Sequence, residues 1–235
     1  MKLSAPVNVL KRRARRLSRD EGILLAKALD RVAADEGYAR WSLLAASIAA
    51  SPGPHDVYAA LRPGELLLLA ARPGQGKTLM SLKLAVEAIG AGRQAFFFTL
   101  DYSRRDVAER LAGMGADLAA FGDRFVLDCS DDISADHVAT RLAGIVRAPF
   151  VVIDYLQLLD QKRDNPPLMQ QVETLRALAR RRDATIVVLS QIDRRFDQEE
   201  RSVPGPGDVR LPNPLDLGLF DRTCFLHRGA VRIGA

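Results

Sequence analysis

The chain has 235 residues, of which 48% are hydrophobic and 27% are charged, a composition that suits one large α/β domain with a small appendage. Its apolar runs, such as LLLLAA, are far shorter than the ~20 residues of a membrane-spanning helix, and the basic N-terminus lacks the apolar core of a secretory signal. Cys129 and Cys224 show neither metal-ligand nor disulfide spacing. We therefore expect a cytoplasmic protein that does not contact a membrane.

The net charge of +5 is concentrated near the N-terminus. Residues 1–50 contain ten Lys or Arg against five Asp or Glu, the remainder contains 24 of each, and six of the basic residues lie within 11–19. Such a segment either contacts a polyanion such as nucleic acid or forms a solvated helix face with ordinary salt partners. The sequence leaves both interpretations open.

Residues 1–50 are predicted to form a small basic module that is helical from residue 7 onward. Ser18 and Glu21 have the spacing of a capping box, so a helix is expected to begin at Ser18. Apolar residues then recur at helical spacing, and Gly37 marks the predicted end of this helix.

A second helix of the module is predicted over Trp41–Ala49. Tyr38 and Trp41 are expected to pack inside the module rather than to stack on a ligand. The stretch 51–56, SPGPHD, is predicted to be a linker because of its proline and glycine content, and it separates the module from residues 57–235.

From residue 57 the pattern alternates between strands and helices. Continuous apolar strands such as FVVI and TIVVL predict an α/β domain with a mainly parallel sheet, buried on both faces and flanked by helices. The predicted strands are Glu65–Ala70, Gln94–Thr99, Phe125–Asp128, Phe150–Ile153, Thr185–Ser190 and Thr223–His227. The predicted helices are Thr78–Ile89, Ser103–Met114, Ser134–Ile145 and Leu168–Arg182. The polar stretch 194–216 is too long for an ordinary connection and is predicted to be a mobile functional loop.

The stretch ARPGQGKT lies between a predicted strand and a predicted helix, which is the context of a phosphate-binding loop. Backbone N–H groups would cradle the β-phosphate of a nucleotide, Lys77 would bridge the β- and γ-phosphates, and Thr78 would place its hydroxyl on Mg²⁺. Ala71 replaces the first glycine of the strict pattern, a mild departure because the position mainly needs a small residue. The predicted ATP-binding residues are Arg72, Pro73, Gly74, Gln75, Gly76, Lys77, Thr78 and Leu79.

Three polar residues at the ends of other predicted strands complete the site. Asp154 follows the buried strand FVVI and is predicted to bind Mg²⁺ with Thr78, because a buried carboxylate needs a cation or hydrogen bonds. Asp101 is the candidate for orienting the attacking water, and Gln191 is the candidate sensor of the γ-phosphate. The predicted catalytic residues are therefore Lys77, Asp101, Asp154 and Gln191.

The strings AARPGQGKT, FFFTLDYS, VVIDYLQLL, VVLSQIDR and GDVR, in this order and spacing, resemble the C-terminal motor domain of DnaB-type replicative helicases, which are RecA-like P-loop ATPases. The resemblance covers about residues 57–230. It implies Mg-ATP hydrolysis, a role in DNA replication, and contact with single-stranded DNA through the loops after Asp154 and after Gln191. These loops are 160–170 and 194–212 here, and the basic candidates for phosphate contact are Lys162, Arg163, Arg194, Arg195 and Arg210.

Three departures from the family pattern bear on activity. Asp101 stands where the family carries a glutamate, so its carboxylate is one methylene shorter and slow hydrolysis is expected. The chain is short at its C-terminus relative to the family domain, whose further strands carry an arginine finger that reaches the neighbouring subunit. Neither Arg228 nor Arg232 matches this finger. Such a finger increases the rate of hydrolysis by ~10³-fold or more. Residues 1–50 do not resemble the helicase N-terminal domain.

Two functions therefore stay open at the level of sequence. The first is an ATPase that acts on DNA, either alone or assembled as a homo-oligomeric ring like a helicase motor. The second is a nucleotide-gated binding or adaptor module that hydrolyses ATP slowly or not at all, has no helicase activity, and uses residues 1–50 and the 194–212 loop to hold an unknown partner. A small-molecule kinase fits less well, because no arginine-rich lid follows the metal strand.

Overall fold

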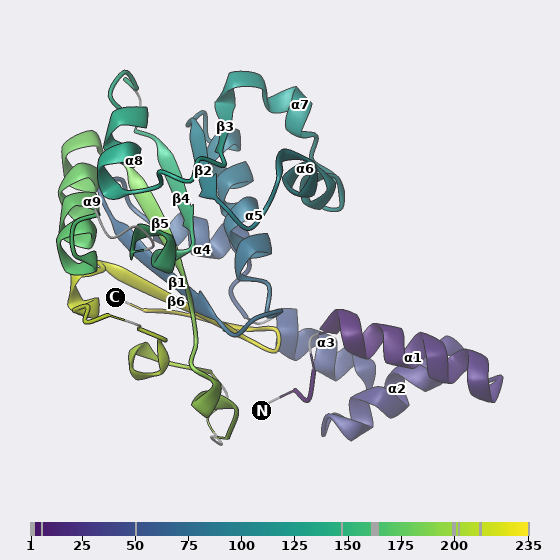
Figure 1. The fold of residues 1–235 in the computed structure, drawn as a ribbon. Helices are drawn as coiled ribbons and strands as arrows, with labels where there is room; N and C mark the ends of the chain where they lie inside the picture. The colour runs from purple at the N-terminus through teal and green to yellow at the C-terminus, as the bar shows by residue number, and fades with distance from the viewer. Residues whose placement is uncertain are drawn as a thin grey trace.

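The computed structural model describes residues 3–5, 7–49, 51–146, 148–160, 165–198, 201, 203–211 and 213–234. Its strands form one seven-stranded sheet in the order β3-β2-β4-β5-β1-β6-β7 (Figure 1), and only the β6–β7 pair is antiparallel. The strands are β1 (Leu66–Ala71), β2 (Ala95–Thr99), β3 (Phe125–Asp128), β4 (Phe150–Asp154), β5 (Thr185–Gln191), β6 (Arg222–His227) and β7 (Ala230–Gly234). The predicted α/β fold with a mainly parallel sheet is confirmed.

Helices cover both faces of the sheet, as predicted. One face carries α4 (Pro54–Ala60), α5 (Lys77–Gly90), α6 (Arg104–Ala112) and α7 (Leu118–Phe121). The other face carries the 3-10 helix η2 (Leu156–Asp160), α8 (Ala135–Arg141) and α9 (Leu168–Arg182). No helix among the described residues combines the length and apolar character needed to cross a bilayer.

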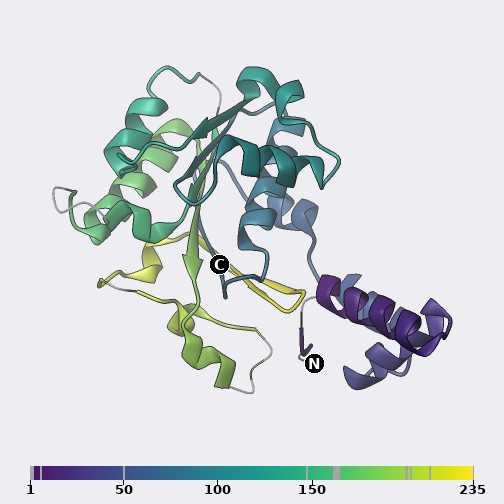
Figure 2. The same cartoon turned by 45° about the vertical axis from the view of Figure 1, so that its right-hand side comes forward.

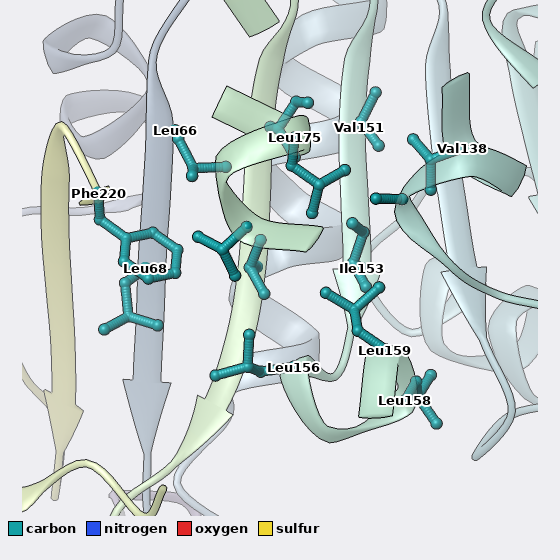
Figure 3. Packing of buried hydrophobic residues seen from close by; sticks show 14 of the residues in the cluster. Leu66, Leu68, Val138, Val151, Ile153, Leu156, Leu158, Leu159, Leu175 and Phe220 are labelled. Atoms are coloured by element: carbon teal, nitrogen blue, oxygen red, sulfur yellow. The ribbon is translucent and has the colours of Figure 1, made fainter. Parts of the chain in front are cut away.

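The central strands are apolar on both sides because both of their faces are covered. Leu66 and Leu68 of β1 and Ile153 of β4 lie on the face of α9, in the same buried cluster as Leu175 (Figure 3). Leu67, the residue between the two leucines, lies on the opposite face against α5. All of these side chains are fully buried, which explains why the strands appear in the sequence as continuous hydrophobic runs.

The N-terminal residues form three helices, α1 (Val7–Glu21), α2 (Leu25–Asp35) and α3 (Trp41–Ala49). The expected helix start at Ser18 is wrong, because Ser18 lies inside α1 and its hydroxyl donates to the carbonyl of Ile23 at 2.7 Å. Leu10 and Ala14 continue the apolar spacing on the N-terminal side of Ser18 and are buried against the module. The chain reverses instead at Gly22, where φ is +65°.

The rest of the module agrees with the sequence. The helix α3 has the predicted bounds, and Tyr38 and Trp41 pack against the small core of the module. Figures 1 and 2 show α1 and α2 projecting from the sheet domain, while the module approaches the turn between β6 and β7. A Cβ atom built on Gly229 in this turn would lie 3.3 Å from Cγ2 of Val7.

Several connections are more ordered than the sequence suggests. The predicted linker 51–56 already contains the start of α4 at Pro54, and β7 was not predicted at all. The stretch 194–216 contains the 3-10 helices η3 (Arg194–Gln198) and η4 (Pro206–Asp208), followed by η5 (Leu217–Leu219). A bridge pairs Ile192, just before this stretch, with Val209 inside it.

A buried glutamine is predicted to be important for stability. The Oε1 atom of Gln171 accepts from the Ala135 N–H at 3.0 Å, and its Nε2 donates to the carbonyls of Leu159 and Pro166. Gln171→Leu would leave the Ala135 N–H and the Pro166 carbonyl without this partner, while the Leu159 carbonyl keeps a hydrogen bond from Asn165 at 3.0 Å. We expect it to lower the free energy of unfolding by about 2 to 4 kcal/mol, measured by urea denaturation. Gln170→Leu, at the neighbouring exposed position, is the control and should change it by less than about 0.5 kcal/mol. Equal effects of the two substitutions would contradict this role.

Candidate functional site

The loop between β1 and α5 has the backbone conformation of an anion-binding turn. Gly74 and Gly76 have φ angles of +76° and +89°, which disfavour any residue with a side chain. Gly76 is the N-cap residue and Lys77 is the first residue of α5. The unpaired N–H groups of the first helical turn therefore face the site, where a negatively charged group would be stabilised.

The centre of the site is a buried contact between Thr78 and Asp154. The Thr78 hydroxyl donates to Oδ2 of Asp154 at 2.9 Å, and both residues are buried. Burial raises the pKa of the Asp154 carboxyl, while the positive charge of Lys77 and the hydrogen bond from Thr78 partly offset this effect. The two residues predicted to hold the metal are thus in direct contact.

The donor atoms at this contact fit a magnesium ion. Within the described part of the chain, Oδ1 of Asp154 is buried and has no hydrogen-bond partner. A buried carboxylate oxygen without a partner is costly, and it lies beside a hydroxyl that is another oxygen donor. Mg²⁺ prefers such oxygen ligands and is commonly held by one or two protein groups together with phosphate oxygens.

Asp101 and Arg110 bring further charge to Asp154. Asp101 follows β2, and its N–H donates at 3.2 Å to Oγ1 of Thr99, the residue paired with Asp154 in the sheet register. The negative charge of Asp101 contributes to the raised pKa of Asp154, and the positive charge of Arg110 opposes it. Arg110 is stacked on the Tyr102 ring at 4.1 Å, an arrangement that fixes the guanidinium near the site.

The end of β5 supplies Ser190 and Gln191 beside the loop. Ser190 pairs with Ala70 and Gln191 with Ala71 in the parallel register. Among the described residues, Oγ of Ser190 is buried and has no hydrogen-bond partner, whereas Gln191 is partly exposed. Gln191 thus lies at the same edge of the sheet as Lys77 and Asp154, as a residue that senses a phosphate would.

Two predicted nucleotide-binding side chains face elsewhere. Arg72 forms an ion pair with Asp197 at 2.9 Å and donates to the Ile192 carbonyl at 3.2 Å, so its side chain holds the segment after β5. The Oε1 atom of Gln75 accepts from the Arg228 N–H at 2.6 Å, in the turn between β6 and β7. These contacts fix the loop to its neighbours.

The arginines after β5 lie together. Arg194, Arg195 and Arg210 are exposed and line one hollow together with Arg72 and Gln191. Backbone hydrogen bonds fold this segment back on itself, from Asp193 N–H to the Asp208 carbonyl and from Arg210 N–H to the Gln191 carbonyl. A positively charged hollow therefore borders the phosphate-binding loop. Lys162 and Arg163, the other two basic candidates, lie outside the described residues.

Sequence reasoning missed Arg110, Tyr155 and Asp197. Tyr155 directly follows Asp154, and burial together with the charges of Asp101 and Asp154 raises the pKa of its hydroxyl. The positive charge of Arg110 lowers the pKa of Asp154, and Asp197 forms an ion pair with Arg72. Both partners are distant in the sequence. Nothing local in the sequence marks either contact.

Comparison with known proteins places this geometry in a family. Residues 57–207 match the family model "ATPase: KaiC". The replicative DNA helicase DnaB of Leifsonia xyli subsp. xyli is 27% identical over 199 residues, which cover 72% of this chain and 43% of the helicase. A probable plasmid replicative DNA helicase of Chlamydia muridarum is 28% identical over 68% of this chain and 43% of its own length. The chain thus spans less than half the length of these curated relatives.

Solved structures agree on the fold. A DnaB-like replicative helicase, described with its primase interactions, superposes with a TM-score of 0.59 at 19% identity, covering 74% of this chain and 54% of its own. A KaiC-like protein from Pyrococcus horikoshii gives a TM-score of 0.53 at 17% identity, covering 69% of this chain and 70% of its own. At these identities, the similarity shows a shared RecA-like architecture.

The raised pKa of Asp154 predicts a pH-dependent stability. The unfolded chain releases this proton near pH 4, while the folded protein retains it to a higher pH, so the wild type loses stability as the pH rises above ~4. Asp154→Asn removes the effect. We therefore expect the stability of this variant to improve relative to the wild type as the pH rises above ~4, measured by urea unfolding without nucleotide or metal.

Asp128→Asn is the control of opposite sign. Burial alone would raise the pKa of Asp128, but the hydrogen bond of His137 and the charge of Arg141 lower it overall. The stability that this carboxylate contributes grows as the pH rises toward ~4 and is fully present above it, so Asp128→Asn should fall behind the wild type below pH ~4 and keep a constant deficit above it. If the relative stability of Asp154→Asn does not change above pH ~4, the buried carboxyl is not perturbed as the structure indicates.

Proposed function

The chain belongs to the KaiC family of ATPases, as a RecA-like domain of the DnaB type, and on this premise we propose that it binds and hydrolyses Mg-ATP and acts on single-stranded DNA. The observation that carries the proposal is the buried pair of Thr78 and Asp154, which closes the phosphate-binding loop against β4 at 2.9 Å. A turn with an incidental lysine would have no reason to bury a carboxylate beside it.

In this proposal each part of the loop has a separate role. The N–H groups from Gly74 onward, at the start of α5, hold the β-phosphate, and Lys77 contributes the charge that balances the γ-phosphate. Thr78 and Asp154 would hold Mg²⁺, which when bound neutralises charge on the phosphate oxygens. The hydroxyl and the carboxylate already lie on the same side of the loop, so little rearrangement is required of this chain.

Asp101 and Gln191 are proposed to act on the reacting end of the nucleotide. Asp101 is exposed and lies close enough to Asp154 for its charge to influence that carboxyl. Its carboxylate would orient the attacking water, and Gln191, across the site on β5, would contact the γ-phosphate. The backbone bond from Arg210 to Gln191 then connects this sensor to the arginine-lined hollow.

A second hollow offers space for the nucleoside. It lies beside the first turn of α5 and is lined in part by Pro52, Leu79, Lys83, Leu226 and Val231. Its mixture of apolar surface and one lysine suits a heterocycle and a sugar. Leu79 was predicted to bind the cofactor, and in this arrangement its exposed side chain would contact the nucleoside.

Single-stranded DNA is proposed to bind the hollow lined by Arg194, Arg195 and Arg210. Guanidinium groups pair well with phosphates, and the hollow borders Gln191, so bound DNA and the γ-phosphate would lie on opposite sides of one residue. Lys162 and Arg163 remain candidates from the family resemblance. A homo-oligomer, participation in DNA replication and a cytoplasmic location are proposed on the same resemblance, without an assigned arginine finger.

The ATPase proposal is tested by the steady-state rate of ATP hydrolysis with and without single-stranded DNA at low salt. We expect Lys77→Ala to lower the rate by about 100-fold or more, because the charge at the phosphates is lost. We expect the double variant Arg195→Ala, Arg210→Ala to reduce the ratio of the DNA-stimulated rate to the DNA-free rate. Arg124→Ala with Arg181→Ala, which removes two exposed arginines elsewhere, should leave that ratio unchanged. A rate that DNA does not stimulate at low salt would contradict the action on DNA.

Substitutions of Asp101 distinguish the two proposed functions, an ATPase motor and a nucleotide-gated adaptor. We expect Asp101→Asn to lower kcat by at least about 10-fold while ATP affinity is retained, because the charge that orients water is lost. Asp101→Glu restores the longer carboxylate of the family and should raise kcat above that of the wild type. An unchanged kcat in Asp101→Asn would remove the residue from the mechanism. Lys77-dependent ATP binding without hydrolysis in the wild type would favour the adaptor.

A further inference from the structure

The outward face of α1 carries a row of basic side chains that the nucleotide site does not use. Lys11, Arg12, Arg15, Arg16 and Arg19 are all exposed. Their spacing of one, three and four residues places them on one side of the helix. The opposite side, with Leu10 and Ala14, is buried against the rest of the module.

Little negative charge balances this row. Asp20 and Glu21, at the end of α1, are the only acidic residues of the helix. Asp20 pairs with Arg16 at 3.4 Å, and Glu21 forms an ion pair with Arg31 of α2. Within the described residues, Arg12, Arg15 and Arg19 take part in no ion pair. Like charges three and four residues apart repel each other, and a bound polyanion would relieve that repulsion.

The row is also accessible. Figures 1 and 2 show α1 and α2 projecting away from the sheet domain, so the strands and their covering helices do not shield the outward face of α1. A helix of 15 residues is about 22 Å long. Duplex DNA carries one phosphate charge per ~1.7 Å of its axis, so a straight helix of this length meets many phosphates.

We propose that the outward face of α1 is a binding surface for the phosphate backbone of duplex DNA, separate from the arginine-lined hollow beside the nucleotide site. Arginine predominates in the row, and its planar guanidinium forms paired hydrogen bonds to phosphate. In this proposal duplex DNA is the binding partner of residues 1–50. It requires no nucleotide, and it goes beyond the proposed ATPase function.

Two other occupants suit the face less well. Single-stranded nucleic acid is usually held by exposed aromatic rings that stack on bases, but Tyr38 and Trp41 are packed against the core of the module. An interfacial membrane helix inserts its apolar face into lipid, but the apolar face of α1, with Leu10 and Ala14, is already buried. A rigid, strongly charged duplex matches what remains exposed.

The test is duplex binding by the full chain without ATP, followed by fluorescence anisotropy of a short labelled duplex. The variant is Arg12→Ala, Arg15→Ala, Arg19→Ala. We expect it to bind at least about 10-fold more weakly at low salt, and the slope of log affinity against log salt between ~50 and ~200 mM to become shallower by roughly 3. Alanine favours the helix, so folding of α1 is preserved, and the matched Arg→Lys triple should restore most of the binding.

The control removes basic side chains from the same module outside α1. Lys27 and Arg40 are exposed and take part in no ion pair among the described residues, so their double alanine variant should bind duplex DNA like the wild type. Unchanged binding by the α1 variant would overturn the proposal, as would equal losses in both variants. A loss confined to single-stranded DNA or to vesicles containing anionic phospholipid would also overturn it, in favour of that occupant. Lys77→Ala should bind duplex DNA normally, which keeps this result separate from failure of the ATPase proposal.

Discussion

The burial of one carboxylate, Asp154, governs the arrangement of the whole nucleotide site. A charge at the end of a central, fully covered strand is unfavourable unless donors and cations surround it. The parallel sheet meets this requirement because the carboxyl ends of β1, β2 and β5 lie at the same edge as the end of β4. The loop after β1 brings Lys77 and Thr78, and the segment after β2 brings Asp101. Each of these residues lies near Asp154 because its strand runs parallel to β4.

This constraint also explains what the sequence could predict. The apolar runs of β1, β4 and β5 indicate strands buried on both faces, and their polar end residues then have to meet at one edge. Strand order does not have to be known for that argument. The expected positions of Lys77, Thr78 and Asp154 follow from it, and the structure places the Thr78 hydroxyl 2.9 Å from Asp154.

The errors arise where local signals compete or where contacts are distant in the chain. Ser18 matches a capping box, yet the apolar spacing continues through it, and burial of Leu10 and Ala14 favours one unbroken helix. The strand β7 is short and partly exposed, so it has no apolar run to reveal it. The pairing of Arg72 with Asp197 spans 125 positions, and no local pattern encodes a contact at that separation.

Arginines show most clearly why composition alone does not locate function. Arg93 donates at 2.9 Å to the carbonyls of Ala148 and Pro149 and to the Thr185 hydroxyl, and Arg222 pairs with Glu65 at 3.1 Å. Such guanidinium groups stabilise the domain and are not available to a ligand. Arg194, Arg195 and Arg210 beside Gln191, and Arg12, Arg15 and Arg19 along α1, take part in no ion pair among the described residues. The arginines therefore become informative only after the structural ones have been set aside, and the exposed ones that remain form two surfaces, one beside the phosphate-binding loop and one on the projecting module.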